Sequence, residues 1–89
     1  MIIRAIYYGK DFVRQFKRLP QLIQERAIKK EDVFRKNPLH PSLRLHQLHG
    51  DWGGYWSLSI TLFYRIIFQR MDNGDILFIS IGRHDIYDQ

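Results

Sequence analysis

The chain has 89 residues, of which 45% are hydrophobic and 15% are aromatic, and it contains no cysteine. This length allows one domain with a single core and excludes a separate cofactor domain, while the lack of cysteine excludes a disulfide framework and a thiolate zinc site. Fourteen Lys and Arg residues against nine Asp and Glu residues give a net charge of +5. This charge favours a polyanion or an acidic protein as partner, and a solvated helix face that only maintains solubility explains it equally well.

The N-terminal segment predicts a strand followed by a helix. Residues 2–8 are rich in β-branched and aromatic side chains, which is typical of a strand, and Gly9 ends it. Hydrophobic residues then recur with the spacing of one helix face. These residues are Phe12, Val13, Phe16 and Leu19. Pro20 ends this helix.

A second helix is expected over residues 21–36, because Pro20 lies directly before it and proline suits the first turn of a helix. Its apolar face is formed by Ile23, Ala27, Val33 and Phe34. Asn37-Pro38 ends it, since the residue before a proline is biased away from the helical conformation. Two consecutive helices joined at a proline indicate a helical hairpin that packs on a sheet.

The second half of the chain predicts four strands separated by turns. They are expected over residues 43–49, 55–63, 64–71 and 76–82. The sequence GDWGG separates the first two, and Asn73-Gly74 suits a hairpin turn between the last two. Apolar and polar residues alternate in the second of these strands. We therefore expect Trp56 to face the helices, and Ser57 and Ser59 to face solvent or a ligand.

The resulting order, β-α-α-β-β-β-β, separates the helices from most of the strands, which predicts an α+β fold. We expect residues 1–89 to form a single domain with a curved, mostly antiparallel sheet. The N-terminal helical hairpin covers one face of this sheet. The other face is then free, and it is the expected binding surface.

Arg65 is the most unusual residue of the second half, because it lies between Tyr64 and Ile66 in an apolar strand. Cleavage of RNA through its own 2′-OH requires a base, a cation that stabilises the phosphorane, and an acid for the leaving oxygen. Histidine serves as acid or base near neutral pH, and arginine binds phosphate through two parallel hydrogen bonds. We therefore expect His46, Arg65 and His84 to form a catalytic site for RNA that needs no metal.

Further residues extend this expected RNA surface. Tyr55 and Tyr87 can stack on bases, and basic side chains can bind phosphates. The expected basic contacts are Arg44, Arg83, Lys10, Arg14 and Lys17. Each catalytic candidate also has an ordinary structural explanation. These explanations are an exposed strand histidine at His46, an ion pair of Arg65 with Asp85 or another acid, a local contact of His84 with Asp85, and docking of the C-terminus by Tyr87.

Other chemistries have little support in the sequence. His46 and His49 are three positions apart, so on a strand they point to opposite faces and cannot share one metal ion. No serine lies in a Gly-x-Ser-x-Gly elbow, and no glycine-rich loop has the spacing and the lysine that bind phosphate. We expect neither a metal nor a cofactor.

The order of the motifs resembles the RelE/ParE superfamily of toxins from type II toxin–antitoxin modules. The motifs are Asn37-Pro38 after two helices, LHGDWGGYWS at 48–57, YRIIF at 64–68 and IGRHDIY at 81–87. The helical hairpin with its Leu19-Pro20 junction also fits, so the likeness extends over nearly the whole chain. The YoeB and YafQ branches are the most similar in these motifs.

This resemblance implies a microbial-RNase-like α+β fold and a metal-independent mRNA endonuclease that acts on the ribosome and is neutralised by a cognate antitoxin. It implies that His46 stands at the position of the general base, that Arg65 contacts the scissile phosphate and that His84 is the general acid. Tyr87 lies close to the position of a family aromatic residue. The residues alone do not decide between the two histidines, which could exchange the roles of acid and base.

The sequence also departs from the family pattern. Ser59 and Phe63 stand where the YafQ-like branch has a histidine and an aspartate, and only Arg44 remains of the lysine-rich set of the RelE branch. Because the superfamily includes ParE toxins that act on DNA gyrase, a gyrase inhibitor and an inactive toxin-fold binding protein stay as alternatives. The N-terminus lacks the layout of a signal peptide, and no run is long enough to cross a membrane. We expect a cytoplasmic protein whose partners are an antitoxin and mRNA on the ribosome, and not a membrane.

Overall fold

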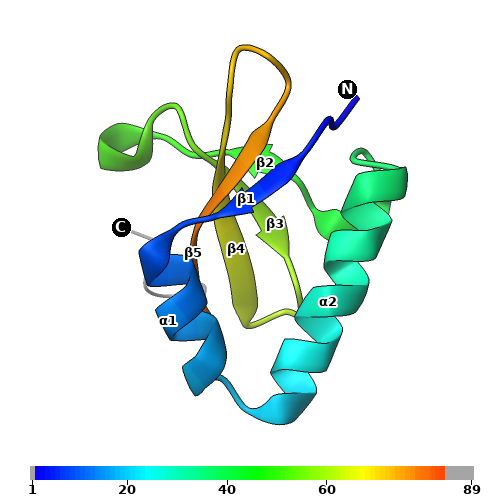
Figure 1. Cartoon of the computed structure of the whole chain (residues 1–89), viewed down its shortest axis with the longest axis vertical. Helices are drawn as coiled ribbons and strands as arrows, with labels where there is room; N and C mark the ends of the chain where they lie inside the picture. Colours follow the sequence, from blue (N-terminus) through cyan, green and yellow to red (C-terminus); the bar gives the residue numbers. More distant parts are fainter. Residues whose placement is uncertain (1, 84–89) are drawn as a thin grey trace.

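Five strands and two helices form the part of the chain that this computed structural model describes, residues 2–83 (Figure 1). The elements are β1 (Ile6–Tyr8), α1 (Lys10–Arg18), α2 (Gln21–Lys36), β2 (His46–Gln47), β3 (Trp56–Ser59), β4 (Tyr64–Arg70) and β5 (Ile76–Arg83). The strands form one sheet in the order β1-β5-β4-β3-β2, in which β1 is parallel to β5 and every other pair is antiparallel. This confirms the predicted α+β fold and its order of elements. Among the described helices, none is long and apolar enough to cross a membrane.

Helices α1 and α2 form the predicted hairpin, and side-chain hydrogen bonds hold its junction. Leu19 leaves the helical conformation with ψ at 152°, as expected for a residue before proline. Gln24 Nε2 donates to the carbonyl oxygens of Phe16 at 2.9 Å and of Leu19 at 3.1 Å. The Phe16 oxygen also accepts from the Leu19 N–H at 3.1 Å, so Gln24 adds a second donor to the end of α1, where helical carbonyl groups run out of partners. In Figure 1 the two helices diverge from this junction at the bottom of the view.

Both helices pack on one face of the sheet through aromatic side chains. Phe34 of α2 is fully buried, and its ring centroid lies 5.1 Å from that of Phe68 and 6.2 Å from that of Phe78. The ring of Phe12 on α1 lies 5.3 Å from that of Phe78. Burial of each such side chain stabilises the fold by about 1.5–3 kcal/mol. The core is therefore centred on β4 and β5, under the apolar faces that the sequence predicts for both helices.

The face of the sheet away from the helices is closed along one row of residues. The strand register places Ser57 opposite Ile67, and Ile67 opposite Ser80. The exposed fractions of these residues are 0%, 0% and 7%, and that of Ser59 is 6%. Ser57 and Ser59 therefore lie on the predicted face, away from the helices, but neither is exposed to solvent. Ser57 is covered because the guanidinium of Arg65 lies against its hydroxyl.

Two of the predicted strands are shorter than expected because each pairs with its neighbour over only a few residues. β1 is limited to three residues, since β5 begins only at Ile76, the register partner of Ile6. The segment 43–49 pairs with β3 only at His46 and Gln47. Leu43 instead belongs to a short 3₁₀ turn and is fully buried in the core.

β3 also ends earlier than the alternating pattern predicts. The hydroxyl of Thr61 accepts hydrogen bonds from the backbone N–H groups of Phe63 at 3.1 Å and of Tyr64 at 3.2 Å. Serine and threonine hydroxyls favour turns of this kind. The chain therefore reverses over residues 60–63, and Leu62, which the pattern places on the helix face, is 66% exposed.

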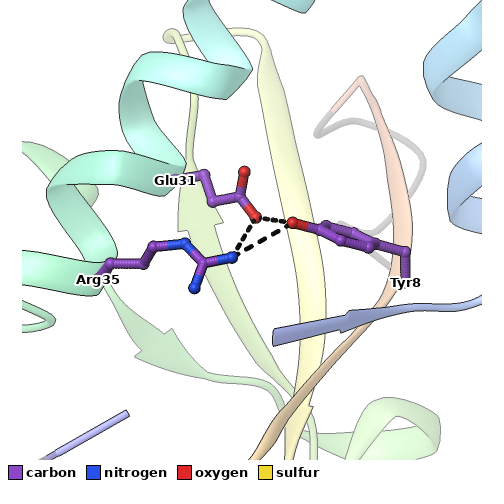
Figure 2. A network of polar contacts seen from close by, with 3 residues as sticks. All are labelled: Tyr8, Glu31 and Arg35. Carbon is purple, nitrogen blue, oxygen red and sulfur yellow. Dashed lines mark hydrogen bonds and ion pairs between the residues drawn. The ribbon is translucent and has the colours of Figure 1, made fainter. Parts of the chain in front are cut away.

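A polar cluster fastens the edge strand β1 to α2. The hydroxyl of Tyr8 donates to Glu31 Oε2, and Arg35 Nη2 lies 3.4 Å from both that carboxylate oxygen and the hydroxyl (Figure 2). Burial, followed by the hydrogen bond and the charge of Glu31, raises the pKa of Tyr8 above its ordinary value of 10.0, and Arg35 acts in the opposite direction. We call Tyr8, Glu31 and Arg35 the β1–α2 clasp.

Candidate active site

Arg65 is anchored to a buried serine on the neighbouring strand. Its Nη1 donates to Ser57 Oγ at 3.1 Å. The register partner of Arg65 is Ser59, so Ser57 is its diagonal neighbour across β3 and β4, within reach of a long side chain. Because Ser57 is fully buried, this hydrogen bond gives the half-buried guanidinium a fixed position on the sheet.

His46 completes this group from β2. It is the register partner of Ser57, so its side chain lies on the face of the sheet away from the helices. His46 Nδ1 lies 3.4 Å from Arg65 Nη1 and 3.2 Å from the backbone oxygen of Arg44. Within residues 2–83, His46 Nε2 and Arg65 Nη2 make no hydrogen bond or ion pair. We call Ser57, Arg65 and His46 the Arg65 group. This group presents a nitrogen atom of an exposed imidazole and one edge of a guanidinium to a ligand.

Arg44 has a strained backbone that serves this arrangement. With φ at 46° and ψ at 45° it takes the left-handed conformation, and it is the only non-glycine residue with positive φ in the described part of the chain. This conformation costs about 1–2 kcal/mol for a residue with a side chain. The Arg44 N–H donates to the Pro41 oxygen at 3.1 Å. This hydrogen bond closes the turn that brings the Arg44 carbonyl beside the imidazole of His46.

Two other predicted RNA contacts, Tyr55 and Arg83, lie on opposite faces of the sheet. Tyr55 lies two residues before Ser57, so the alternation of β3 puts it on the same face, where its ring contacts Trp52 edge-on at 5.8 Å between centroids. Arg83 is the register partner of Tyr64 and therefore lies on the opposite face from Arg65. Its guanidinium carbon lies 5.9 Å from the ring centroid of Tyr64. The strand register does not bring Arg83 to the Arg65 group.

The basic residues of α1 form a separate surface. Lys10, Arg14 and Lys17 line a shallow depression together with Tyr8, Val13 and Arg18. Helix α1 follows the edge strand β1, whereas His46 lies on β2 at the other edge of the sheet. Neither His46 nor Arg65 lines this depression. Arg44, in contrast, contacts His46 through its backbone oxygen.

The expected acid His84 and the expected aromatic residue Tyr87 lie outside the described residues, as does Asp85, the competing ion-pair partner of Arg65. The last described residue of β5 is Arg83. Gly82, two residues before His84, is the register partner of Arg65.

No metal site is formed by the side chains that the structure describes. Within residues 2–83, no group of three or more His, Asp or Glu residues is placed to hold an ion. The chemistry that this part of the chain offers is hydrogen bonding to an anion by Arg65 and proton transfer by His46.

Ser57 is the site residue that the sequence-based interpretation missed. The available signal was the position of Arg65 in an apolar strand, because a buried guanidinium needs an acceptor. The neighbouring strand offers two hydroxyls on one face, Ser57 and Ser59. The choice between them depends on the register of β3 against β4, which the sequence does not give.

A second hollow lies between the two helices. It has a volume of about 360 Å³ and is lined mainly by apolar side chains of α1, α2 and the sheet, among them Phe12, Val13, Phe16, Ala27, Ile28 and Phe78. Val13 is 38% exposed and Ile28 is 57% exposed. Lys17 and Glu31 are also part of its lining. We call this hollow the interhelical groove.

Comparison with known proteins identifies the fold. No protein-family model matches the sequence, and no curated protein matches it at a significant level. The YoeB/ParE toxin from Agrobacterium tumefaciens superposes with a TM-score of 0.74 at 18% identity, covering 91% of this chain and 99% of that chain. YafQ from Escherichia coli superposes with a TM-score of 0.70 at 22% identity, covering 97% and 99%. The chain in the DinJ–YafQ toxin–antitoxin complex of E. coli gives a TM-score of 0.69 at 23% identity, covering 99% and 100%. The chain therefore has a RelE/ParE-like toxin fold, similar to YoeB and YafQ.

Proposed function

We propose that this chain, with its RelE/ParE-like toxin fold, is the toxin of a type II toxin–antitoxin module. We propose further that it is a metal-independent mRNA endonuclease that acts on the ribosome. The observation that carries this proposal is the Arg65 group: a guanidinium anchored by Ser57 lies 3.4 Å from the imidazole of His46. The sequence resemblance to YoeB and YafQ toxins supports the same reading.

The geometry suits cleavage of RNA through its own 2′-OH. Nη2 of Arg65 and the adjacent edge of the guanidinium can bind the scissile phosphate and stabilise the negative charge of the phosphorane. His46 is close enough to contact a nucleotide bound there and to accept the proton of its 2′-OH. We propose His84 as the acid that protonates the 5′-oxygen and Tyr87 as a neighbouring aromatic contact. The products are then a 2′,3′-cyclic phosphate, or the 3′-phosphate formed from it, and a 5′-hydroxyl.

The proposed protein partner is a cognate antitoxin. The solved complex of DinJ with YafQ is a toxin–antitoxin complex, and the net charge of +5 favours an acidic partner. The interhelical groove is apolar, and the cations of α1 border it. We propose that an acidic amphipathic helix of the antitoxin binds this groove, with its apolar face toward Val13 and Ile28. Its carboxylates then face the basic side chains of α1.

Induced expression in cells tests the toxin function. We expect the wild-type chain to arrest growth and to cut mRNA, and Arg65→Ala to do neither. Arg70→Ala is the matched control, because Arg70 lies on the same strand but is exposed at its far end. Equal toxicity and equal mRNA cleavage by wild type and Arg65→Ala contradict the proposal. Growth arrest without mRNA cleavage, together with inhibition of DNA supercoiling by gyrase, supports the ParE-like alternative instead.

A further inference from the structure

His46 Nδ1 lies within hydrogen-bond distance of one acceptor and one donor. The backbone oxygen of Arg44, at 3.2 Å, can only accept a hydrogen bond, whereas Arg65 Nη1, at 3.4 Å, can only donate one. In the neutral imidazole one ring nitrogen carries the proton and the other accepts. Whichever neighbour engages Nδ1 therefore decides the tautomer of His46.

The tautomer decides what His46 can do for RNA. If Nδ1 carries the proton and donates to Arg44, the lone pair lies on Nε2, which makes no hydrogen bond within residues 2–83 and can act as a base. If Nδ1 instead accepts from Arg65, the proton moves to Nε2, and that atom can no longer accept the proton of the 2′-OH. A single contact thus separates a base from an inactive ring.

Ser57 fixes the position of Arg65, the donor that competes for His46 Nδ1. Its hydroxyl is fully buried and accepts from Arg65 Nη1 at 3.1 Å, the shorter of the two contacts of that nitrogen. The anchored guanidinium stays 3.4 Å from the ring, at the outer limit of a hydrogen bond. We infer that Ser57 is a positioning residue: by holding Arg65, it leaves His46 Nδ1 to donate to the Arg44 carbonyl and so keeps Nε2 available as the base. This inference rests on the proposed function for its catalytic meaning, but the tautomer itself does not require RNA.

The left-handed turn at Arg44 supplies the acceptor for His46 Nδ1. It places a carbonyl beside Nδ1 through the backbone, so the side chain of residue 44 is not needed for it. Glycine accepts the backbone angles of Arg44 without strain. Arg44→Gly should therefore keep the tautomer of His46 while removing a cation from the RNA surface.

Long-range ¹H–¹⁵N correlation of the histidine rings measures the tautomer directly in the free protein. His46 signals are assigned by their loss in His46→Gln. His40 is an internal reference, because its Nδ1 accepts from the Ser42 N–H at 3.1 Å and its proton must lie on Nε2. We expect His46 to show the opposite tautomer, with the proton on Nδ1.

Three variants then test the role of Ser57. Ser57→Ala should move His46 toward the Nε2–H tautomer and lower the cleavage rate roughly tenfold or more, with little change in KM. Ser59→Ala, a buried serine on the same strand and face, should change neither. In the double variant Ser57→Ala/Arg65→Ala the Nδ1–H tautomer should return, because the competing donor is gone.

The tautomers of His46 in these spectra test the role of Ser57. A wild-type ring with its proton on Nε2, or an unchanged tautomer in Ser57→Ala, overturns the inference. If the tautomers change as expected but the wild-type protein cuts no RNA, the positioning by Ser57 stands and the proposed function fails. If Ser57→Ala changes the tautomer but still cleaves RNA rapidly, the proposal that His46 Nε2 is the base is wrong.

Discussion

Arg65 and Ser57 are joined diagonally across β3 and β4 by a hydrogen bond of 3.1 Å, on the face of the sheet that the helices leave free. This bond turns a cation in an apolar strand into a fixed anion-binding group. It also explains why Ser57, which the alternation of β3 directs away from the helices, is fully buried. The site therefore begins with a residue pair that no linear motif shows.

Replacing Arg65 by lysine separates charge from geometry. Lysine keeps the positive charge but lacks the planar fork that binds a phosphate through two hydrogen bonds. We expect Arg65→Lys to retain most of the affinity for ribosomes and to lose cleavage by about 10- to 100-fold. Ribosome sedimentation measures the first and primer extension on the cut mRNA measures the second. Arg70→Lys, on the exposed end of the same strand, should leave both unchanged, and a fully active Arg65→Lys would show that only charge matters.

The two groups of cations should differ in the salt dependence of binding. Each phosphate contact that is lost lowers the slope of log K against log salt by about 0.7 for a single strand. If α1 contributes to RNA binding, the triple replacement of Lys10, Arg14 and Lys17 by alanine should lower the slope by about 2, while Arg44→Gly lowers it by about 0.7. Fluorescence anisotropy with a short labelled RNA, at several salt concentrations, gives these slopes. An unchanged slope in the triple variant would assign the α1 cations to another partner.

The β1–α2 clasp predicts a specific loss of stability at alkaline pH. The pKa of Tyr8 is raised in the folded protein by burial and by Glu31, so the clasp stabilises the fold fully below pH 10 and loses this contribution as the pH rises through the higher folded-state pKa. Tyr8→Phe should cost about 0.5–1 kcal/mol at pH 8, and the difference from wild type should shrink above pH 10. Urea denaturation at both pH values measures this. Tyr7→Phe is the control, since Tyr7 is the exposed neighbour on β1, and a difference that is constant with pH would contradict the role of the clasp.

The interhelical groove should bind the antitoxin without taking part in cleavage. A charge at Val13 or Ile28 places a carboxylate against the apolar face of the incoming helix, which opposes binding. We expect Val13→Glu/Ile28→Glu to lower the affinity for the purified cognate antitoxin by 100-fold or more, which is about 3 kcal/mol. Isothermal titration calorimetry gives the affinity.

Cleavage of mRNA by this double variant should remain at the wild-type rate, because neither residue belongs to the Arg65 group. Leu39→Glu is the control for added charge, since Leu39 is 67% exposed and lies outside the groove. Wild-type affinity in the double variant would show that the antitoxin binds elsewhere.

The sequence predicts the architecture well because its signals are local. Helical spacing of Phe12 and Phe16, the proline at the hairpin junction and the turn at Asn73-Gly74 all act within a few residues of each other. The strand ends were harder to predict, since they depend on pairing between distant segments. β1 begins only at Ile6 because its parallel partner β5 begins at Ile76, and β3 stops because the Thr61 hydroxyl forms a turn that the apolar pattern of residues 60–63 conceals.

The site was predictable only in part, for the same reason. Arg65 and His46 are notable residue types, and the structure places Arg65 Nη1 3.4 Å from His46 Nδ1. Ser57 is an ordinary residue whose role depends on register, and the Arg44 carbonyl is a backbone group that no residue pattern indicates. Arg83 was predicted as an RNA contact from its charge, and its register puts it on the opposite face from Arg65.

A single change in the RNA tests the central claim most directly. A purified translation reaction is given an mRNA that carries a 2′-deoxy or 2′-O-methyl nucleotide at the mapped cut site, and the ends of the products are determined. The account predicts that the wild-type chain leaves a 2′,3′-cyclic phosphate or 3′-phosphate and a 5′-hydroxyl on the unmodified RNA, and that it does not cut at the modified nucleotide. Cleavage at the modified nucleotide, or a product with a 5′-phosphate, would contradict cleavage through the 2′-OH with His46 as the base and Arg65 as the phosphate-binding group.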